Sequence, residues 1–431
     1  MNIIYTKDKN KLIHGDNLDV MQLINENEID SCISDFPYFI EFMNKKWDSK
    51  IEIYKWCYPR AIELFRIMKN GGYVCIFGHH KTNHRMKCAF EDAGFNIVEE
   101  IDWIQLTGFP KNQDIGKMFD RAEGLDREII SVDTTKQRPN ASINRSKENA
   151  VGKFGIKGDG GVVTEPQSEL AKQFNGFKTS GLKPLKEIIT IFQKPLIGTY
   201  IQNIKQYGCG AMNIDACRVP MSKDDEKIIN AKSSKNPTQN YSSKDDKIFG
   251  AYDKDMSMPA NSKGRFPPNV FFDEAMAHEL DLQTGITKSS GGQINSCFRK
   301  NSAIYNTGTD KKESIDGGYG DVGGGSRLFP MFKYEPKTSK KERMLHNGTR
   351  NPHVTVKPKN LIKWLIKLVT PLNGITIDIT AGSCTHAVSC EELNRYEDYN
   401  LTWFNIELMN TEDEPYCNIG KQRLEDLNET I

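Results

Sequence analysis

The stretch Ser34-Asp35-Phe36-Pro37-Tyr38 decides how this 431-residue chain is interpreted. It follows Ile29-Asp30-Ser31-Cys32-Ile33, a run typical of a short buried strand. A carboxylate, a rigid turn and an aromatic ring thus meet at a strand end, where open α/β sheets place their binding sites. Asp35 and the Phe36 carbonyl can accept hydrogen bonds from an amino group, and Tyr38 can stack on the ring that carries it. For these five residues alone, an ordinary β-turn containing proline is an equal alternative.

Composition excludes several classes of protein. No apolar run reaches the roughly 18 residues of a membrane span, and the N-terminus lacks the basic-then-apolar layout of a signal peptide. The 10 cysteines form no Cys-x-x-Cys pair, so we expect reduced thiols and no metal site. His79, His80 and His84 lack carboxylate or cysteine partners at ligand spacing and predict a solvated or DNA-facing loop. With a net charge of +1, any nucleic-acid binding has to come from local basic patches.

Hydrophobic periodicity separates two ordered ends from a loose middle. Residues 1–120 alternate between strand and helix patterns. Residues 121–350 are rich in glycine, serine and lysine, apart from a predicted core strand near residues 183–195. The ordered pattern returns in residues 351–431, where a helix is predicted to begin at Pro358. The sequence therefore predicts an α/β protein whose sheet is built from both ends, with a large irregular insertion.

A second candidate site lies near the C-terminus. A predicted strand that ends at Asp378 is followed by a loop of small residues, a helix, and a strand that ends at Glu407. This layout is typical of the nucleoside-binding half of a Rossmann-type sheet, in which an acidic side chain binds ribose hydroxyls. Glu407 follows Gly382 by 25 residues, close to the roughly 20 expected. Because Gly382 is the only glycine of the loop, an ordinary βα turn is the alternative for this segment alone.

Together the two ends resemble the amino-group DNA methyltransferases that use S-adenosylmethionine, in the β-type order of their motifs. Asp35-Phe36-Pro37-Tyr38 stands where that family has Asp-Pro-Pro-Tyr. Residues 378–385 stand where it has Asp-Pro-Phe-x-Gly-Ser-Gly-Thr. Further matching blocks include Gly15-Asp16, residues 69–72, 210–215, 265–270 and 353–358, Ile406-Glu407 and Arg423-Leu424. The resemblance implies a Rossmann-like methyltransferase sheet, with residues 121–350 as a target-recognition region, of the type that phages and mobile elements carry.

The resemblance also implies an activity and a set of site residues. The expected reaction is methyl transfer from S-adenosylmethionine to N6 of a flipped adenine in a specific double-stranded DNA sequence. An N4-cytosine enzyme and a weak or inactive DNA-binding relative are the alternatives. Asp35, Phe36, Pro37 and Tyr38 are expected to hold the target amine. The residues expected to bind the cofactor are Asp16, Ser34, His353, Thr355, Lys357, Asp378, Thr380, Gly382, Ser383, Cys384, Thr385 and Glu407.

The chain departs from the family pattern in both motifs. Phe36 replaces the first proline of the tetrapeptide, which keeps the carbonyl but predicts a less rigid turn. Thr380 replaces an aromatic residue, and Cys384 replaces the second glycine of the cofactor loop. If position 384 has a positive φ, a cysteine there costs about 1 kcal/mol or more, and its side chain would crowd the cofactor. We therefore expect a reshaped loop, weak cofactor binding or an impaired enzyme.

The basic run within residues 333–359 predicts contacts with the phosphates of double-stranded DNA. A solvated charged face is the alternative. The candidate DNA-binding residues are Lys337, Lys340, Lys341, Arg343 and Arg350. We also expect a monomer or a homodimer without membrane association, located in the cytoplasm of a bacterial cell or a phage-infected host. A cognate restriction nuclease is a candidate partner.

Overall fold

A computed structural model gives the structure of the chain. It describes residues 1–40, 52–106, 112–132, 162–227, 263–288, 293–295, 314–316, 322–331, 344–345, 347–348, 350–353 and 355–429. The chain forms two compact units. The larger comprises Met1–Thr107 and Leu185–Ile431, and the smaller comprises Gly108–Pro184. Every helix in the described part of the chain is too short or too polar to cross a bilayer.

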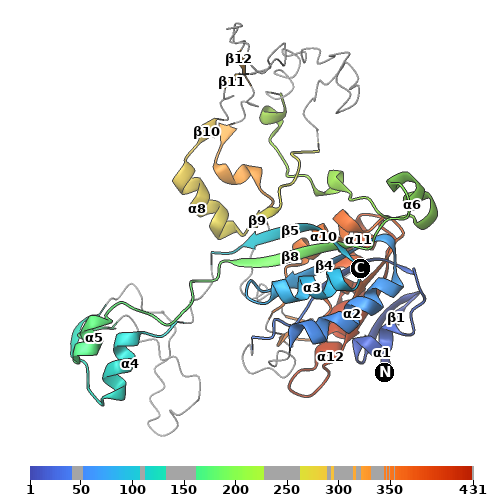
Figure 1. Cartoon of the computed structure of the whole chain (residues 1–431). Coiled ribbons are helices and arrows are strands. Elements are labelled where there is room, and N and C mark those ends of the chain that lie inside the picture. Colours follow the sequence, from blue (N-terminus) through green and yellow to red (C-terminus); the bar gives the residue numbers. More distant parts are fainter. Residues whose placement is uncertain are drawn as a thin grey trace, which may run out of the picture. The chain divides into compact units, whose positions relative to one another are not determined.

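A nine-stranded sheet is the centre of the larger unit (Figure 1). Its order is β1-β2-β15-β14-β3-β4-β8-β5-β9. The strands are β1 Asn2–Lys7, β2 Asn10–His14, β3 Ile29–Asp35, β4 Met68–Gly78, β5 Asn96–Ile104, β8 Lys186–Gln193, β9 Val270–Phe272, β14 Ile375–Asp378 and β15 Thr402–Glu407. β1 and β8 are antiparallel to their neighbours, and the other strands share one direction. Strands from the C-terminus lie between β2 and β3, which confirms that both ends build the sheet.

Helices cover both faces of the sheet. One core contains apolar side chains of α1 Asn17–Met21, α2 Ile53–Ile67 and α3 Asn83–Asp92, and the other those of α10 Lys359–Val369, α11 Thr385–Tyr396 and α12 Tyr416–Glu429. Alternation along β4 shows the division, since Val74 and Ile76 belong to the first core and Cys75 and Phe77 to the second. The result is a three-layer, doubly wound arrangement, and it confirms the α/β, Rossmann-like sheet that the sequence predicts.

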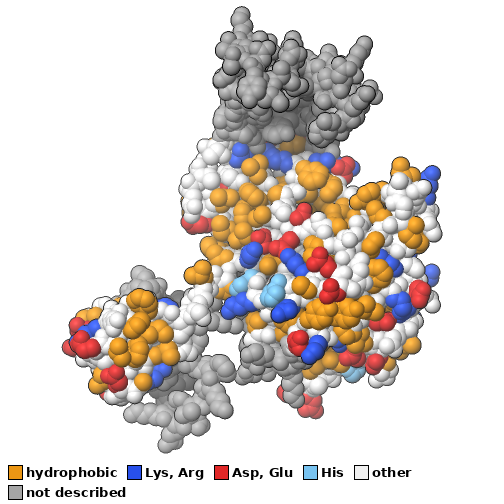
Figure 2. Space-filling model, in the orientation of Figure 1, with side chains coloured by type: hydrophobic (Ala, Val, Ile, Leu, Met, Phe, Trp, Pro, Cys, Tyr) orange, Lys and Arg blue, Asp and Glu red, His pale blue; other side chains and the backbone are white. Residues whose placement is uncertain are grey.

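The middle of the chain contributes to both units. The apolar run predicted near residues 183–195 forms β8, which pairs with β4 and β5 in the main sheet. The small unit contains α4 Ile115–Ala122, β6 Ile129–Val132, β7 Val162–Thr164 and α5 Glu169–Gln173. The remaining elements are α6 Tyr200–Tyr207, η4 Ile214–Cys217, α8 Glu274–Thr284, β10 Thr287–Lys288, β11 Gln293–Asn295, β12 Ser314–Asp316, β13 Val322–Gly323 and η5 Gly325–Leu328. On the face that Figure 2 shows, charged side chains of both signs are interspersed over the larger unit.

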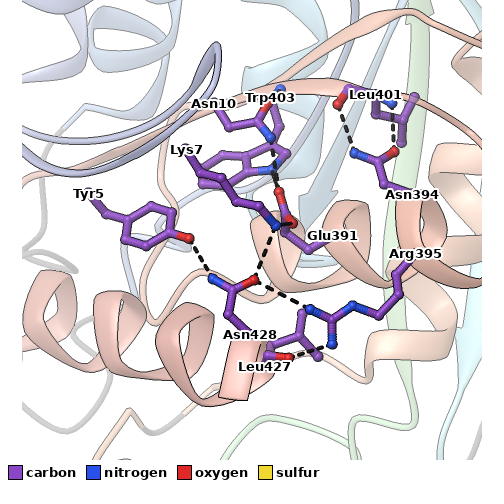
Figure 3. A network of polar contacts seen from close by, with 10 residues as sticks. All are labelled: Tyr5, Lys7, Asn10, Glu391, Asn394, Arg395, Leu401, Trp403, Leu427 and Asn428. Carbon is purple, nitrogen blue, oxygen red and sulfur yellow. Dashed lines mark hydrogen bonds and ion pairs between the residues drawn. The ribbon is translucent and has the colours of Figure 1, made fainter. Parts of the chain in front are cut away.

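A buried polar network joins the first strands to the last helices (Figure 3). Glu391 on α11 accepts hydrogen bonds from Lys7 (2.7 Å), from Asn10 (2.9 Å) and from the indole of Trp403 (2.8 Å). Asn428 on α12 donates to the Tyr5 hydroxyl at 2.9 Å. Because these partners lie up to 423 residues apart in sequence, the network ties the two ends of the chain into one unit.

Candidate active site

The two predicted motifs meet where the direction of winding changes. β3 and β14 are parallel neighbours, with Ser31 opposite Thr376 and Cys32 opposite Ile377. α2, which follows β3, covers one face of the sheet, whereas α11, which follows β14, covers the opposite face. Open α/β sheets bind ligands in the crevice at such a switch point, at the carboxyl ends of the strands. The position that this rule predicts for a ligand crevice lies here between the ends of β3 and β14.

Direct hydrogen bonds connect the tetrapeptide to the glycine loop. Ser34 Oγ donates to Asp378 Oδ1 at 2.5 Å and accepts from the Ile379 backbone N–H at 3.0 Å. Thr380 Oγ1 donates to the Asp35 backbone carbonyl at 3.0 Å. Thr380, which stands at the position of a family aromatic, therefore holds the two motifs together across 345 residues of sequence.

Lys357 lies against the tetrapeptide. Its Nζ is 2.8 Å from Asp35 Oδ2, 3.2 Å from Glu187 Oε2 and 3.3 Å from the Tyr38 hydroxyl. Burial opposes the charge of Lys357, but Asp35 and Glu187 together raise its pKa. Lys357 was predicted among the cofactor-binding residues, and Glu187 at the start of β8 was not predicted at all. The signal that could have found Glu187 is its position as a carboxylate beside the apolar run 188–192.

One carboxylate oxygen of Asp35 has no hydrogen-bond partner among the described residues. Among the described residues, the buried Oδ1 atom has no hydrogen-bond partner, whereas Oδ2 is taken by Lys357. Burial raises the pKa of Asp35, and the Lys357 ammonium opposes that rise. A buried acceptor without a donor costs about 1–3 kcal/mol, so this atom is suited to a donor on a ligand.

The tetrapeptide is held by packing as well as by hydrogen bonds. The Phe36 side chain is buried and meets the Trp56 ring of α2 edge-on, with ring centroids 5.2 Å apart. Phe39 contacts the same indole at 5.3 Å and has a φ of 55°. The aromatic side chain at position 36 thus anchors the turn in the core, where the sequence predicted only a loss of rigidity.

The glycine loop comes close to His353 and Glu407, two side chains that the sequence predicts to bind the cofactor. Gly382 has a φ of +52°, and a Cβ on it would lie 2.6 Å from His353 Nε2. Its backbone N–H donates to Glu407 Oε2 at 2.6 Å, and the Met409 N–H donates to Glu407 Oε1 at 2.7 Å. His353 in turn packs edge-on against Tyr416 at 4.5 Å. A residue other than glycine at position 382 would therefore meet both a strained backbone and a steric clash.

Two carboxyl groups near the glycine loop, those of Asp378 and Glu407, have strongly raised pKa values. Burial raises the pKa of Asp378 to about 7, and the nearby Asp35 charge adds to the rise. Burial also raises the pKa of Glu407 to about 8, with Asp378 contributing. These buried carboxyl groups repel one another, so a ligand with positive charge would stabilise their ionised forms.

Cys384 does have a left-handed backbone, with φ 63° and ψ 40°. Its side chain is fully buried, and a Cβ on Gly420 of α12 would collide with its Sγ atom. The thiol thus packs against α12. The absence of a side chain at Gly420 makes room for the side chain at position 384.

Two further residues hold the loop. Ser383 Oγ accepts from Asn351 Nδ2 at 2.9 Å and from Arg423 Nη1 at 3.3 Å. The same Arg423 nitrogen donates to Thr385 Oγ1 at 3.1 Å. Ser383 and Thr385 were predicted to bind the cofactor, but the sequence assigned no role to Asn351 or Arg423. Both side chains are buried, and Arg423 fixes the loop from α12.

The remaining predicted residues are Asp16, Thr355 and the candidate DNA-binding residues. Asp16 follows β2, caps α1 through the Leu18 N–H, and is 3.6 Å from Arg60. The Thr355 N–H lies 3.3 Å from His353 Nδ1. Arg350 is exposed. The other predicted DNA-binding residues, Lys337, Lys340, Lys341 and Arg343, lie outside the described residues.

The crevice fits the cofactor that the family resemblance implies. Gly382 allows a ligand to approach the backbone, and Glu407 and Asp16 stand at the ends of β15 and β2. The buried carboxyl groups of Asp378 and Glu407 suit the sulfonium and ammonium charges of S-adenosylmethionine. Acidic side chains at these strand ends also suit ribose hydroxyls.

Comparison with known proteins identifies the family. Residues 29–421 match the model of the N6/N4 DNA methylases, and the chain belongs to this family. A stretch of 149 residues is 22% identical to the type II methyltransferase M.HindIII of Haemophilus influenzae, and it covers 26% of this chain. The chain spans about half, 48%, of the length of that curated relative.

Solved structures show more distant likenesses. The PvuII DNA methyltransferase, described as cytosine-N4-specific, is 12% identical with a TM-score of 0.40, and the match covers 98% of this chain and 95% of that one. The M1.HpyAVI–SAM complex is 11% identical with a TM-score of 0.38, and the match covers 96% and 98% of the two chains.

Proposed function

We propose that this chain is a DNA methyltransferase that transfers the methyl group of S-adenosylmethionine to N6 of adenine in double-stranded DNA. The observation that carries the proposal is the buried Oδ1 atom of Asp35, which has no hydrogen-bond partner among the described residues. An acceptor in this position suits the exocyclic amine of a flipped base. The chain's membership of the N6/N4 family supports the same activity.

The chain's own residues align the amine and accept its charge. Asp35 Oδ1 and the Phe36 carbonyl each accept a hydrogen bond from the amine, which favours a tetrahedral nitrogen whose lone pair points to the methyl carbon. S-adenosylmethionine supplies the electrophilic methyl group when bound. As the nitrogen–carbon bond forms and the carbon–sulfur bond breaks, the nitrogen becomes positive. Asp35 then accepts the proton that the nitrogen loses and releases it to solvent.

Tyr38 provides the stacking surface for the base. Its hydroxyl donates to Glu187 Oε2 at 3.1 Å and is 3.3 Å from Lys357 Nζ, so its ring orientation is fixed before DNA binds. In the cofactor half, Gly382, Asp378, Glu407, Asp16 and His353 surround the proposed binding position. Ser34 and Thr380 hold the two halves in register. This arrangement requires no covalent nucleophile.

We place adenine before cytosine because the tetrapeptide begins with Asp35, whereas the cytosine enzymes that this chain resembles more often begin with serine. The site would act on DNA in the cytoplasm of a bacterial cell or a phage-infected host. The proposed enzyme is a monomer or a homodimer, with a cognate restriction nuclease as a candidate partner. The basic residues of the 333–359 segment remain its proposed phosphate contacts.

Transfer of labelled methyl groups to unmethylated DNA tests the proposal, followed by sequencing that reports the modified base and its site. We expect N6-methyladenine at one recognition sequence. Asp35→Ala should abolish transfer while DNA and cofactor still bind. Asp102→Asn, on β5, is the matched control because its carboxylate pairs with the exposed Lys186 at 2.9 Å. N4-methylcytosine would correct the target base. DNA binding without transfer by the unaltered protein would favour an inactive relative.

A further inference from the structure

A cluster of polar contacts surrounds the Lys357 ammonium. The three donors of a lysine match its three partners, Asp35 Oδ2, Glu187 Oε2 and the Tyr38 hydroxyl. Tyr38 also donates to Glu187 Oε2, and Gln105 donates to Glu187 Oε1 at 3.2 Å. Among the described residues, Asp35 Oδ1 is the atom of this cluster that is left without a partner.

The sheet places the two carboxylates on either side of the lysine. Asp35 ends β3 and is paired with Phe77 of β4, which is paired in turn with Ile189 of β8. Because β8 is antiparallel to β4, its first residues lie at the same edge as the carboxyl ends of β3 and β4. Lys357 Nζ lies 5.0 Å from the centroid of the Phe77 ring, on the middle strand. Glu187 and Asp35 thus hold the ammonium from opposite sides.

The Lys357 ammonium is buried, so the loss of one of its partners is costly. The side chain of Lys357 is only 9% exposed, against 28% for Glu187. A buried ammonium turns to any acceptor within reach when a partner is removed, because leaving it unpaired is costly. Without Glu187, the unpartnered Oδ1 atom of the same Asp35 carboxylate is an acceptor within reach of the ammonium, and it is the atom proposed to receive the amine. Glu187 therefore controls which oxygen of Asp35 stays free.

We propose that Glu187 and Lys357 are positioning residues: Glu187 holds the Lys357 ammonium on Asp35 Oδ2, so that Oδ1 faces the target amine. This inference rests on the proposed methyl transfer and adds two residues to it. Lys357 has a second effect, since its positive charge favours the ionised form of Asp35. Neither residue needs to touch the cofactor for this role.

The charges around Asp35 predict opposite effects for the two substitutions. The groups that face it are Lys357, Glu187, Tyr38 and the carboxyl of Asp378. Lys357→Met removes the cation and raises the pKa of Asp35, so the acidic limb of the kcat profile moves to higher pH. Glu187→Gln removes a negative neighbour and lowers that pKa, so the acidic limb moves to lower pH. A purely structural role would not shift the two limbs in opposite directions.

Single-turnover methyl transfer across pH 5–9 tests the inference, together with crystal structures of the unaltered protein and Glu187→Gln. At pH 7 we expect Lys357→Met to lower the rate roughly 100-fold and Glu187→Gln roughly 10-fold. Lys357→Arg should recover part of the loss. Cofactor affinity, measured by calorimetry, should change less than about three-fold. Glu100→Gln on β5 is the control, because this carboxylate pairs with Lys87 and its exposure of 33% matches that of Glu187.

The outcomes separate the two proposals. If the unaltered protein transfers no methyl group to DNA, the proposed function fails, and the crystal structures still report whether Lys357 moves toward Oδ1 in Glu187→Gln. If the unaltered protein is active but Glu187→Gln keeps its rate, its pH profile and the 2.8 Å contact of Lys357 with Oδ2, the positioning role is wrong. Shifts of both acidic limbs in the same direction would also overturn it.

Discussion

The two halves of the crevice achieve order in different ways. In the base half, side chains hold one another and leave Asp35 Oδ1 open. In the cofactor half, the Glu407 oxygens accept backbone N–H groups from Gly382 and Met409, and Asp378 accepts from Ser34 and Thr380. The base half is therefore prepared to receive a donor. In the proposed cofactor half, a cationic ligand would share these acceptors and displace protons from Asp378 and Glu407.

The largest expected effects separate the two halves directly. Asp35→Ala should lower the rate of transfer roughly 1,000-fold or more, because alignment and charge stabilisation are lost together. Its cofactor affinity should stay within about three-fold. Glu407→Ala should weaken cofactor binding roughly 10- to 100-fold through the loss of charge-assisted hydrogen bonds. Single-turnover kinetics and calorimetry measure the two quantities. Equal losses of cofactor affinity in both variants would mean that base binding and cofactor binding are not separated between the two halves.

Gly382→Ala should weaken cofactor binding and destabilise the fold, because the new Cβ meets His353 at a positive φ. We expect a loss of about 1–3 kcal/mol in the free energy of unfolding, measured by denaturant titration. Gly124→Ala is the matched control, since Gly124 has a φ of +70° with nothing within 4 Å of the added Cβ. This control should lose only the free energy that an alanine costs at a positive φ, without a steric clash. If both variants lose the same free energy, the contact with His353 contributes nothing.

Cofactor affinity should depend on pH through the cofactor half. The pKa of Asp378 is about 7 and that of Glu407 about 8, so a cationic ligand has to displace protons from them near neutrality. We expect affinity to fall at least about 10-fold between pH 7.5 and pH 5.5, since one displaced proton changes affinity up to ten-fold per pH unit. Calorimetry in buffers of different ionisation enthalpy should detect proton release. A constant affinity over this range would contradict the prediction.

The same groups affect stability with the opposite sign. The pKa values of Asp378 and Glu407 are raised in the folded state. Their contribution to folding is therefore largest at pH values below the pKa values that these groups have in the unfolded chain. That contribution is lost as pH rises through 7 to 8. Without ligand, the free energy of unfolding should therefore include a component that decreases between pH 5 and 9, and saturating cofactor should reduce this decrease. Glu407→Gln, which cannot ionise, should show a shallower dependence.

The smallest expected effect concerns Cys384. Cys384→Gly should leave cofactor affinity within about two-fold and stability within about 1 kcal/mol, because relief of the positive φ offsets the loss of a buried thiol. Gly420→Ala should cost about 1–3 kcal/mol by overpacking, and adding Cys384→Gly should recover most of it. Thermal unfolding of the single and double variants measures the coupling. A tighter cofactor complex in Cys384→Gly would show that the thiol does obstruct the crevice.

The sequence predicted the sheet and both motifs because each motif follows a recognisable strand. It could not place Glu187, because the antiparallel pairing of β8 decides which end of that strand reaches the crevice. Lys357 lies in the matched segment, yet the reach of its side chain to Asp35 depends on the position of β3. Packing of Phe36 on Trp56 likewise depends on α2. Contacts between distant elements were thus the part that local pattern did not contain.

The order of the strands has a consequence for synthesis on the ribosome. Ser34 bonds to Asp378, which is made 344 residues later. At about 5–20 residues per second, the early strands wait roughly 20–70 s for β14 and β15. During that time the facing edges of β2 and β3 lack their native neighbours and expose backbone groups that pair readily with other chains. The nascent chain of this protein is therefore expected to be most prone to aggregation until its last strands emerge.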